Sequence, residues 1–146
     1  MKSTQLTAVL FATALGTGAA VAQNQMPVED QPMTIGGIET VCTGSGLDAR
    51  ADPQWRAYPF HLEVAGKSGQ YLGDEQVSVT GNGQSVSVHC VGPWVLMKLP
   101  AGSYKVSLDV PEGGHRDLTV KVPGRIVVHF PNAGGAEAPN GRVASK

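Results

Sequence analysis

Apolar and polar residues alternate with a period of two along the middle of this chain, the pattern of half-buried β-strands. The clearest runs cover residues 60–64, 77–80, 85–90, 104–110, 118–122 and 126–130, with a weaker run at 35–42. Residues 94–99 are almost wholly apolar, as in a central strand that is buried on both faces. Beyond Ala22, no window has the periodicity of an amphipathic helix.

Turn-forming residues separate these runs, among them Gly81-Asn82-Gly83, Pro100-Ala101-Gly102 and Pro123-Gly124. Seven or eight short strands with this spacing predict an all-β fold, a β-sandwich with Greek-key connections. A small barrel is the alternative architecture.

The segment from Met1 to Ala22 predicts a cleavable signal peptide. Lys2 supplies the positive charge, Leu6 to Val21 is uncharged, and Ala20-Val21-Ala22 has the small-x-small pattern of a cleavage site. The alternative is a transmembrane anchor, but the stretch is short and rich in Ala, Thr and Gly. We expect cleavage after Ala22 and a periplasmic or secreted mature chain without a transmembrane anchor.

The remaining chain, residues 23–146, has the length of one domain. Polar, Pro-containing residues 23–33 predict a flexible lead-in, residues 34–130 the β-domain, and Gly/Ala/Pro-rich residues 131–146 a disordered tail. The mature chain has 10 basic and 12 acidic side chains, which argues against a nucleic-acid partner.

Two cysteines, Cys42 and Cys90, predict a disulfide, because an isolated pair in an exported domain is usually oxidised. Cys90 shares its inward parity with Val86 and Val88, which places the bond in or beside the core. A redox or metal thiol pair is the alternative, but the chain has no Cys-x-x-Cys motif.

The segments Gly92-Pro93-Trp94-Val95-Leu96 and Lys98 to Val106 resemble the Leu-Pro-x-Gly-x-Tyr hairpin of carboxypeptidase regulatory-like domains, which belong to the transthyretin-like β-sandwiches. Gly69 to Asp74 is similar to a second element of that group. The resemblance covers roughly residues 57 to 130. Within this group, the chain is most similar to small proteobacterial envelope proteins that carry a single such domain. It implies a transthyretin-like sandwich that serves as a folding, spacing or binding module, without shared catalytic residues.

One enzymatic branch of the transthyretin group hydrolyses 5-hydroxyisourate and carries a C-terminal Tyr-Arg-Gly-Ser motif. This chain ends in Arg142-Val143-Ala144-Ser145-Lys146, so the activity is not carried over. No Gly-x-Ser-x-Gly elbow occurs, and no spacing fixes Glu63, Asp74 or Glu75 as a catalytic carboxylate pair. We therefore expect a protein that is not an enzyme and needs no cofactor.

Two sets of residues remain as candidate sites. Trp55, Tyr58 and Tyr71 are aromatics in or near loops, where they could contact a protein or glycan partner. His61, His89 and His129 have outward parity and would bind a metal if their strands were neighbours. The favoured hypothesis is an exported envelope accessory or binding module, and the alternative is a periplasmic metal-binding or hydrolytic protein that uses these histidines.

Overall fold

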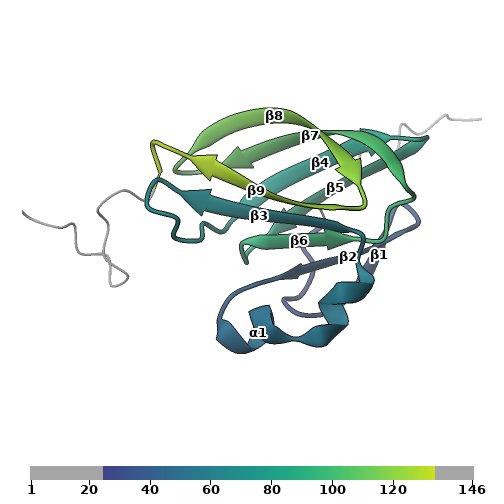
Figure 1. Ribbon diagram of the computed structural model, residues 1–146, viewed down its shortest axis with the longest axis horizontal. Coiled ribbons are helices and arrows are strands. Elements are labelled where there is room, and N and C mark those ends of the chain that lie inside the picture. The colour runs from purple at the N-terminus through teal and green to yellow at the C-terminus, as the bar shows by residue number, and fades with distance from the viewer. Residues whose placement is uncertain (1–24, 134–146) are drawn as a thin grey trace, which may run out of the picture.

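The computed structural model describes residues 25–133, which form two packed β-sheets (Figure 1). The first sheet has five strands in the order β1-β2-β6-β3-β9, and the second has four in the order β5-β4-β7-β8. The strands of the first sheet are β1 (Met33–Ile35), β2 (Ile38–Thr43), β6 (Trp94–Met97), β3 (Phe60–Gly66) and β9 (Gly124–Phe130). Those of the second are β5 (Gln84–Cys90), β4 (Glu75–Gly81), β7 (Gly102–Val110) and β8 (Gly114–Val122). Strands β3 and β9 run parallel, and all other neighbouring strands are antiparallel.

The predicted all-β sandwich is confirmed, but the described residues form nine strands rather than seven or eight. The extra strand arises because the predicted strand at residues 35–42 is broken at Gly36-Gly37. Both glycines have positive φ angles, 57° and 80°, so the chain turns back and pairs β1 with β2.

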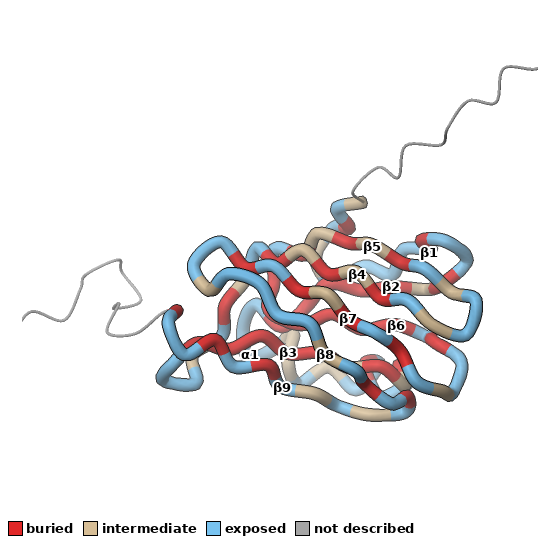
Figure 2. Tube along the Cα trace, turned by 90° about the horizontal axis from the view of Figure 1, so that it is seen from above, coloured by how far each residue is buried: buried red, intermediate tan, exposed pale blue. Residues whose placement is uncertain are grey.

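The main core lies between the two sheets and is built from the inward positions of the alternating runs. Figure 2 shows buried and exposed positions alternating along the strands. The largest of its fully buried side chains are Tyr104, Phe60 and Phe130. Tyr104 also donates a hydrogen bond from its hydroxyl to the Pro100 carbonyl (2.6 Å), which fastens the predicted hairpin.

A second, smaller core lies on the other face of the five-stranded sheet. The short helix α1 (Leu47–Ala51) and the 3-10 helix η1 (Pro53–Ala57) pack there (Figure 1). Its buried members are Val41, Trp55, Tyr58, Trp94 and Leu96. Every residue of β6 is therefore buried, as predicted for a central strand covered on both faces.

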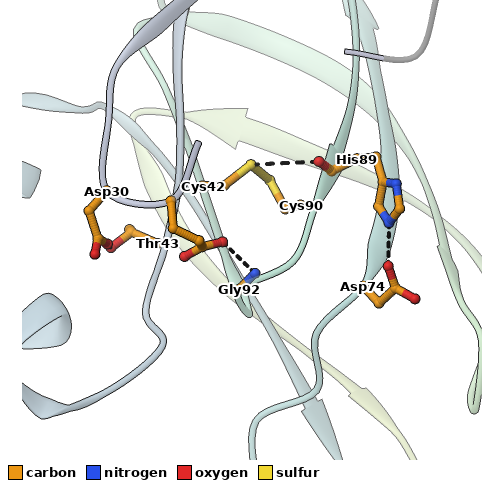
Figure 3. The surroundings of a disulfide bond; sticks show 8 residues. Asp30, Cys42, Thr43, Asp74, His89, Cys90 and Gly92 are labelled. Carbon is orange, nitrogen blue, oxygen red and sulfur yellow. Dashed lines mark hydrogen bonds and ion pairs between the residues drawn. A yellow bond between two sulfur atoms is a disulfide. The ribbon is translucent and has the colours of Figure 1, made fainter. Parts of the chain in front are cut away.

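The predicted disulfide is present: Cys42 on β2 is bonded to Cys90 on β5, with their Cα atoms 5.3 Å apart. The bond joins the two sheets, and both cysteines are fully buried. Figure 3 shows its surroundings, where the Asp30 side chain lies beside Thr43. The Gly92 N–H donates a hydrogen bond to the Glu29 carboxylate in the same region.

Residues 25–32, which we name the N-terminal strap, lie against this end of the sandwich. The Asp30 N–H donates to the Cys42 carbonyl, and the His89 N–H donates to the Gln25 carbonyl. The donor–acceptor distance is 2.8 Å in both hydrogen bonds. The Gly92 N–H donates to Oε1 of Glu29 (2.6 Å). These residues belong to the segment predicted as a flexible lead-in, and here they form hydrogen bonds with backbone groups of the domain.

Two predicted segments fall largely outside the described residues. The signal peptide lies wholly outside them, as do residues 134–146 of the predicted tail. The three described tail residues end in Ala133, which is buried and accepts a hydrogen bond from the Lys67 N–H (2.9 Å). Within residues 25–133, no helix has the length and apolar character needed to cross a membrane.

Candidate functional site

The outer face of the five-stranded sheet is covered by α1 and η1 only over its β2 and β6 side. Strand register places Glu63 between Trp94 of β6 and Val127 of β9, and His61 beside Arg125. Val127 is 43% exposed, so the β9 side of this face is open to solvent. We name the surface formed by Arg50, His61, Glu63, Tyr71, Trp94 and Arg125 the Trp94 face.

A buried carboxylate lies at the centre of the Trp94 face. The Glu63 side chain is only 2% exposed, and its Oε1 lies 2.5 Å from Nη2 of Arg125 and 3.0 Å from Nε2 of His61. The Tyr71 hydroxyl donates to Oε2 of Glu63 over 3.3 Å. Because burying an unpaired carboxylate is costly, these three partners compensate Glu63 and are oriented by it.

Two aromatic rings of the face are each contacted by an arginine. The Arg125 guanidinium carbon lies 5.8 Å from the Trp94 ring centroid, and that of Arg50 lies 5.0 Å from the Tyr71 ring centroid. Both distances are within the range of cation–π attraction. The Tyr71 and Trp94 rings meet edge to face, with centroids 6.1 Å apart. The exposed Tyr71 ring therefore stands beside the buried indole.

Arg50 reaches this surface from α1 and is held by the backbone next to Trp94. Its Nη1 donates to the Gly44 carbonyl over 2.8 Å. Gly44 has a φ of 92°, and a Cβ atom at this position would lie 2.6 Å from Cγ of Trp94. Only glycine both adopts this backbone conformation readily and leaves room for the indole.

The two tryptophans differ in how their indole N–H groups are satisfied. Nε1 of Trp55 donates to the Ala49 carbonyl over 2.7 Å. Nε1 of Trp94 is buried and has no hydrogen-bond partner among residues 25–133. A buried donor without an acceptor costs about 1–3 kcal/mol, so this group would gain from an acceptor atom supplied by a ligand.

The imidazole of His61 is neutral at neutral pH. Burial lowers its pKa, the nearby Arg125 guanidinium lowers it further, and Glu63 acts in the opposite direction. Nε2 of the ring lies 3.0 Å from Oε1 of Glu63, but the two atoms do not form a hydrogen bond of regular geometry. The positive charge on this face therefore comes from the arginines.

The structure separates the three aromatic residues predicted as ligand contacts. Trp55 (4% exposed) and Tyr58 (7% exposed) are buried in the small core beneath α1 and η1, so they are not available to a ligand. Their burial follows from the folding of the predicted loop into two short helices. Tyr71 is 39% exposed and lies on the Trp94 face, as a ligand contact would require.

The three histidines predicted as metal ligands do not come together. His89 lies on β5 of the four-stranded sheet and pairs with Asp74. His61 and His129 share the other sheet, but His129 pairs with Ala65, four residues beyond His61 and about 13 Å along the strands. Zinc ligands lie about 2 Å from the metal. No group of three or more His, Cys, Asp or Glu side chains in residues 25–133 is arranged to hold a metal ion.

A cavity of about 440 Å³ at the end of the four-stranded sheet is a second place where polar side chains gather. His89 lies there against Asp74, and His115 lies between Asp109 (2.8 Å) and Asp117 (2.9 Å). These two carboxylates raise the pKa of His115. Each histidine in the cavity already has a carboxylate partner. The Trp94 face, which has a buried donor without an acceptor among residues 25–133, is therefore the better candidate for a ligand site.

Sequence reasoning did not identify most of the Trp94 face. The pattern gives Glu63 no fixed partner and favours a core position for Trp94 over a ligand contact, and it does not single out Arg50 or Arg125. The available signal was a glutamate in a strand that is otherwise buried, which demands a cationic partner. The sequence does not say that the partner lies on β9, the last strand of the domain.

Comparison with known proteins adds no relative from which a function could be transferred. No protein-family model matches the chain, and no curated protein is similar to it.

Proposed function

We propose that this chain is an exported, non-enzymatic binding module of the cell envelope that engages its ligand through the Trp94 face. The observation that carries the proposal is the buried Nε1 of Trp94, which lacks an acceptor among residues 25–133 and belongs to the same surface as a buried, ion-paired carboxylate. A buried donor without an acceptor costs stability, and an acceptor atom from a ligand would restore it, so the Trp94 indole supports a binding role for this face.

Two observations support a location outside the cytoplasm. A signal-peptide pattern at residues 1–22 supports export, and a buried disulfide between the sheets is the kind of bond that persists in an oxidising compartment. We place the mature protein in the periplasm or outside the cell. The two-sheet sandwich is also what a carboxypeptidase regulatory-like domain would have, and that resemblance supports a module rather than an enzyme.

The contacts on the Trp94 face favour binding over catalysis. Glu63 is held by three side chains at once, and His61 directs Nε2 at that carboxylate. A general acid or base needs its reactive atom directed at a substrate. Here the polar atoms hold one another in place, which presents Tyr71 and Arg125 as a fixed contact surface.

Co-sedimentation with washed cell envelopes tests the proposal. The mature protein would be compared with the Tyr71→Ala and Arg125→Ala variants and with Arg116→Ala as a matched control. Arg116 is also an exposed arginine beside an aromatic ring, Phe130, but it belongs to β8 of the other sheet. We expect both Trp94-face variants to lose most of the sedimenting fraction and the control to keep it. Equal retention by all four proteins would contradict the proposal.

A further inference from the structure

The Trp94 face carries more positive than negative charge. Arg125 is ion-paired with Glu63, whereas Arg50 contacts only the Gly44 carbonyl and the Tyr71 ring among the described residues. No carboxylate among residues 25–133 pairs with Arg50. With His61 neutral, one positive charge on this surface is uncompensated, although the whole chain has a net charge of −1.

The hydrogen-bonding capacity of the two arginines is also incompletely used. A guanidinium has five N–H donors in one plane, which suits it to contact both oxygens of a carboxylate. Arg125 directs Nη2 at Glu63 while its side chain remains 61% exposed. Arg50 commits only Nη1 to a protein acceptor within residues 25–133. Both side chains therefore retain donors for an acidic ligand.

We propose that the ligand of the Trp94 face is an acidic saccharide, a pyranose ring that bears a carboxylate. This inference rests on the proposed function. The half-exposed Tyr71 ring provides an apolar surface for one side of a sugar ring, and the arginines provide the positive charge. Charge complementarity distinguishes this ligand from a neutral glycan or an apolar protein surface.

Each residue then has a separate role. Arg50 and Arg125 contact the carboxylate, and Tyr71 stacks on the ring. Glu63 is a positioning residue, since it is buried and acts through Arg125 and Tyr71.

A tetramer of galacturonic acid and its methyl-esterified form make a matched pair of probes, because esterification removes the charge and keeps the ring. Calorimetric titration of the mature protein should show the acid binding about 10-fold more tightly than the ester. Arg50→Gln and Arg125→Gln should each remove most of that difference, and Arg116→Gln should leave it unchanged. Tyr71→Ala should weaken both probes. Thermal unfolding would confirm that each variant is folded.

The outcomes separate this inference from the proposed function. Equal affinity for acid and ester would overturn the inference while leaving a glycan-binding face. Binding of neither probe, together with envelope co-sedimentation that still depends on Tyr71, would overturn the inference and keep the binding module. If neither probe binding nor envelope co-sedimentation is weakened by Tyr71→Ala, the inference and the proposed function are both overturned. An acid preference that disappears with either arginine variant is the supporting result.

Discussion

Oε1 of Glu63 lies 2.5 Å from Nη2 of Arg125, so a carboxylate buried on β3 is paired with an exposed guanidinium on the parallel strand β9. Because Glu63 is 2% exposed, it depends on this partner for compensation. The Arg125 side chain itself is 61% exposed, and solvent screening weakens the pair. We expect Arg125→Ala to lower the free energy of unfolding by about 1–2 kcal/mol in urea denaturation.

The matched control for that substitution is Arg116→Ala. In the native protein, the Arg116 guanidinium donates to the His129 carbonyl rather than to a buried carboxylate. We expect a cost below about 0.5 kcal/mol for the control. Equal costs for the two variants would mean that the Glu63–Arg125 pair does not stabilise the domain.

A second prediction concerns the fully buried Glu75 at the start of β4. Burial is the main cause that raises its pKa to about 9, and the nearby Glu29 and Asp74 carboxylates act in the same direction. Neither Glu75 carboxylate oxygen has a hydrogen-bond partner among residues 25–133. Glu75 is therefore protonated in the folded protein at neutral pH.

The sign of the pH effect follows from this raised pKa. In the unfolded chain Glu75 loses its proton near pH 4.5, so its contribution to stability is complete below that value and is lost as pH rises to about 9. The loss amounts to about 1.4 kcal/mol per pH unit in this window. The Glu75→Gln variant lacks this titration, so its stability relative to the native protein should rise between pH 5 and 9. Parallel pH profiles of the two proteins in urea unfolding would contradict the assignment.

The disulfide supplies a third prediction. Cys42 and Cys90 are 48 residues apart in sequence, and the bond joins the two sheets. Constraint of a loop of this length in the unfolded chain is worth about 4 kcal/mol. We expect the Cys42→Ala/Cys90→Ala double variant to lose about 2–5 kcal/mol of unfolding free energy, measured in urea. A loss below about 1 kcal/mol would show that the strap and core hold the sheets together without it.

The hairpin tyrosine gives a fourth prediction. Tyr104 is 1% exposed, and its hydroxyl donates to the Pro100 carbonyl at 2.6 Å. Tyr104→Phe removes this hydrogen bond and the longer one that the hydroxyl accepts from Nδ2 of Asn82 (3.5 Å), and it should cost about 1 kcal/mol. Tyr104→Ala also leaves a cavity and should cost about 3–5 kcal/mol. Chemical denaturation of both variants measures the two contributions. A Phe variant as unstable as the Ala variant would be inconsistent with ring packing as the larger contribution.

Much of the sandwich could be predicted because strand alternation depends on local sequence. Val77, Val79, Val86 and Val88 alternate with serines, histidine and threonine, and this alone orients them inward. The disulfide followed from the compartment and from the parity of Cys90. The break at Gly36-Gly37 was missed, although two adjacent glycines are a turn signal.

The candidate site was less accessible because it depends on which strands become neighbours. The Trp94 face exists only because β9 pairs with β3 in parallel, and no local pattern encodes that pairing. The polar residues and the proline around Trp55 predict a loop that could offer it to a ligand. Asp52 instead caps η1 by accepting from the Gln54 N–H, and the helix folds Trp55 onto the sheet.

The chain has only two tryptophans, so the indole N–H resonances in a ¹H–¹⁵N correlation spectrum test the Trp94 face directly. Nε1 of Trp55 is hydrogen-bonded to Ala49 and serves as an internal control, while Nε1 of Trp94 has no partner in the described residues. Trp55→Phe, which removes one signal, would assign the pair. On titration with the galacturonic acid tetramer, we predict that the Trp94 indole signal shifts and the Trp55 signal stays in place. A bound ligand that leaves the Trp94 signal unmoved would contradict the account.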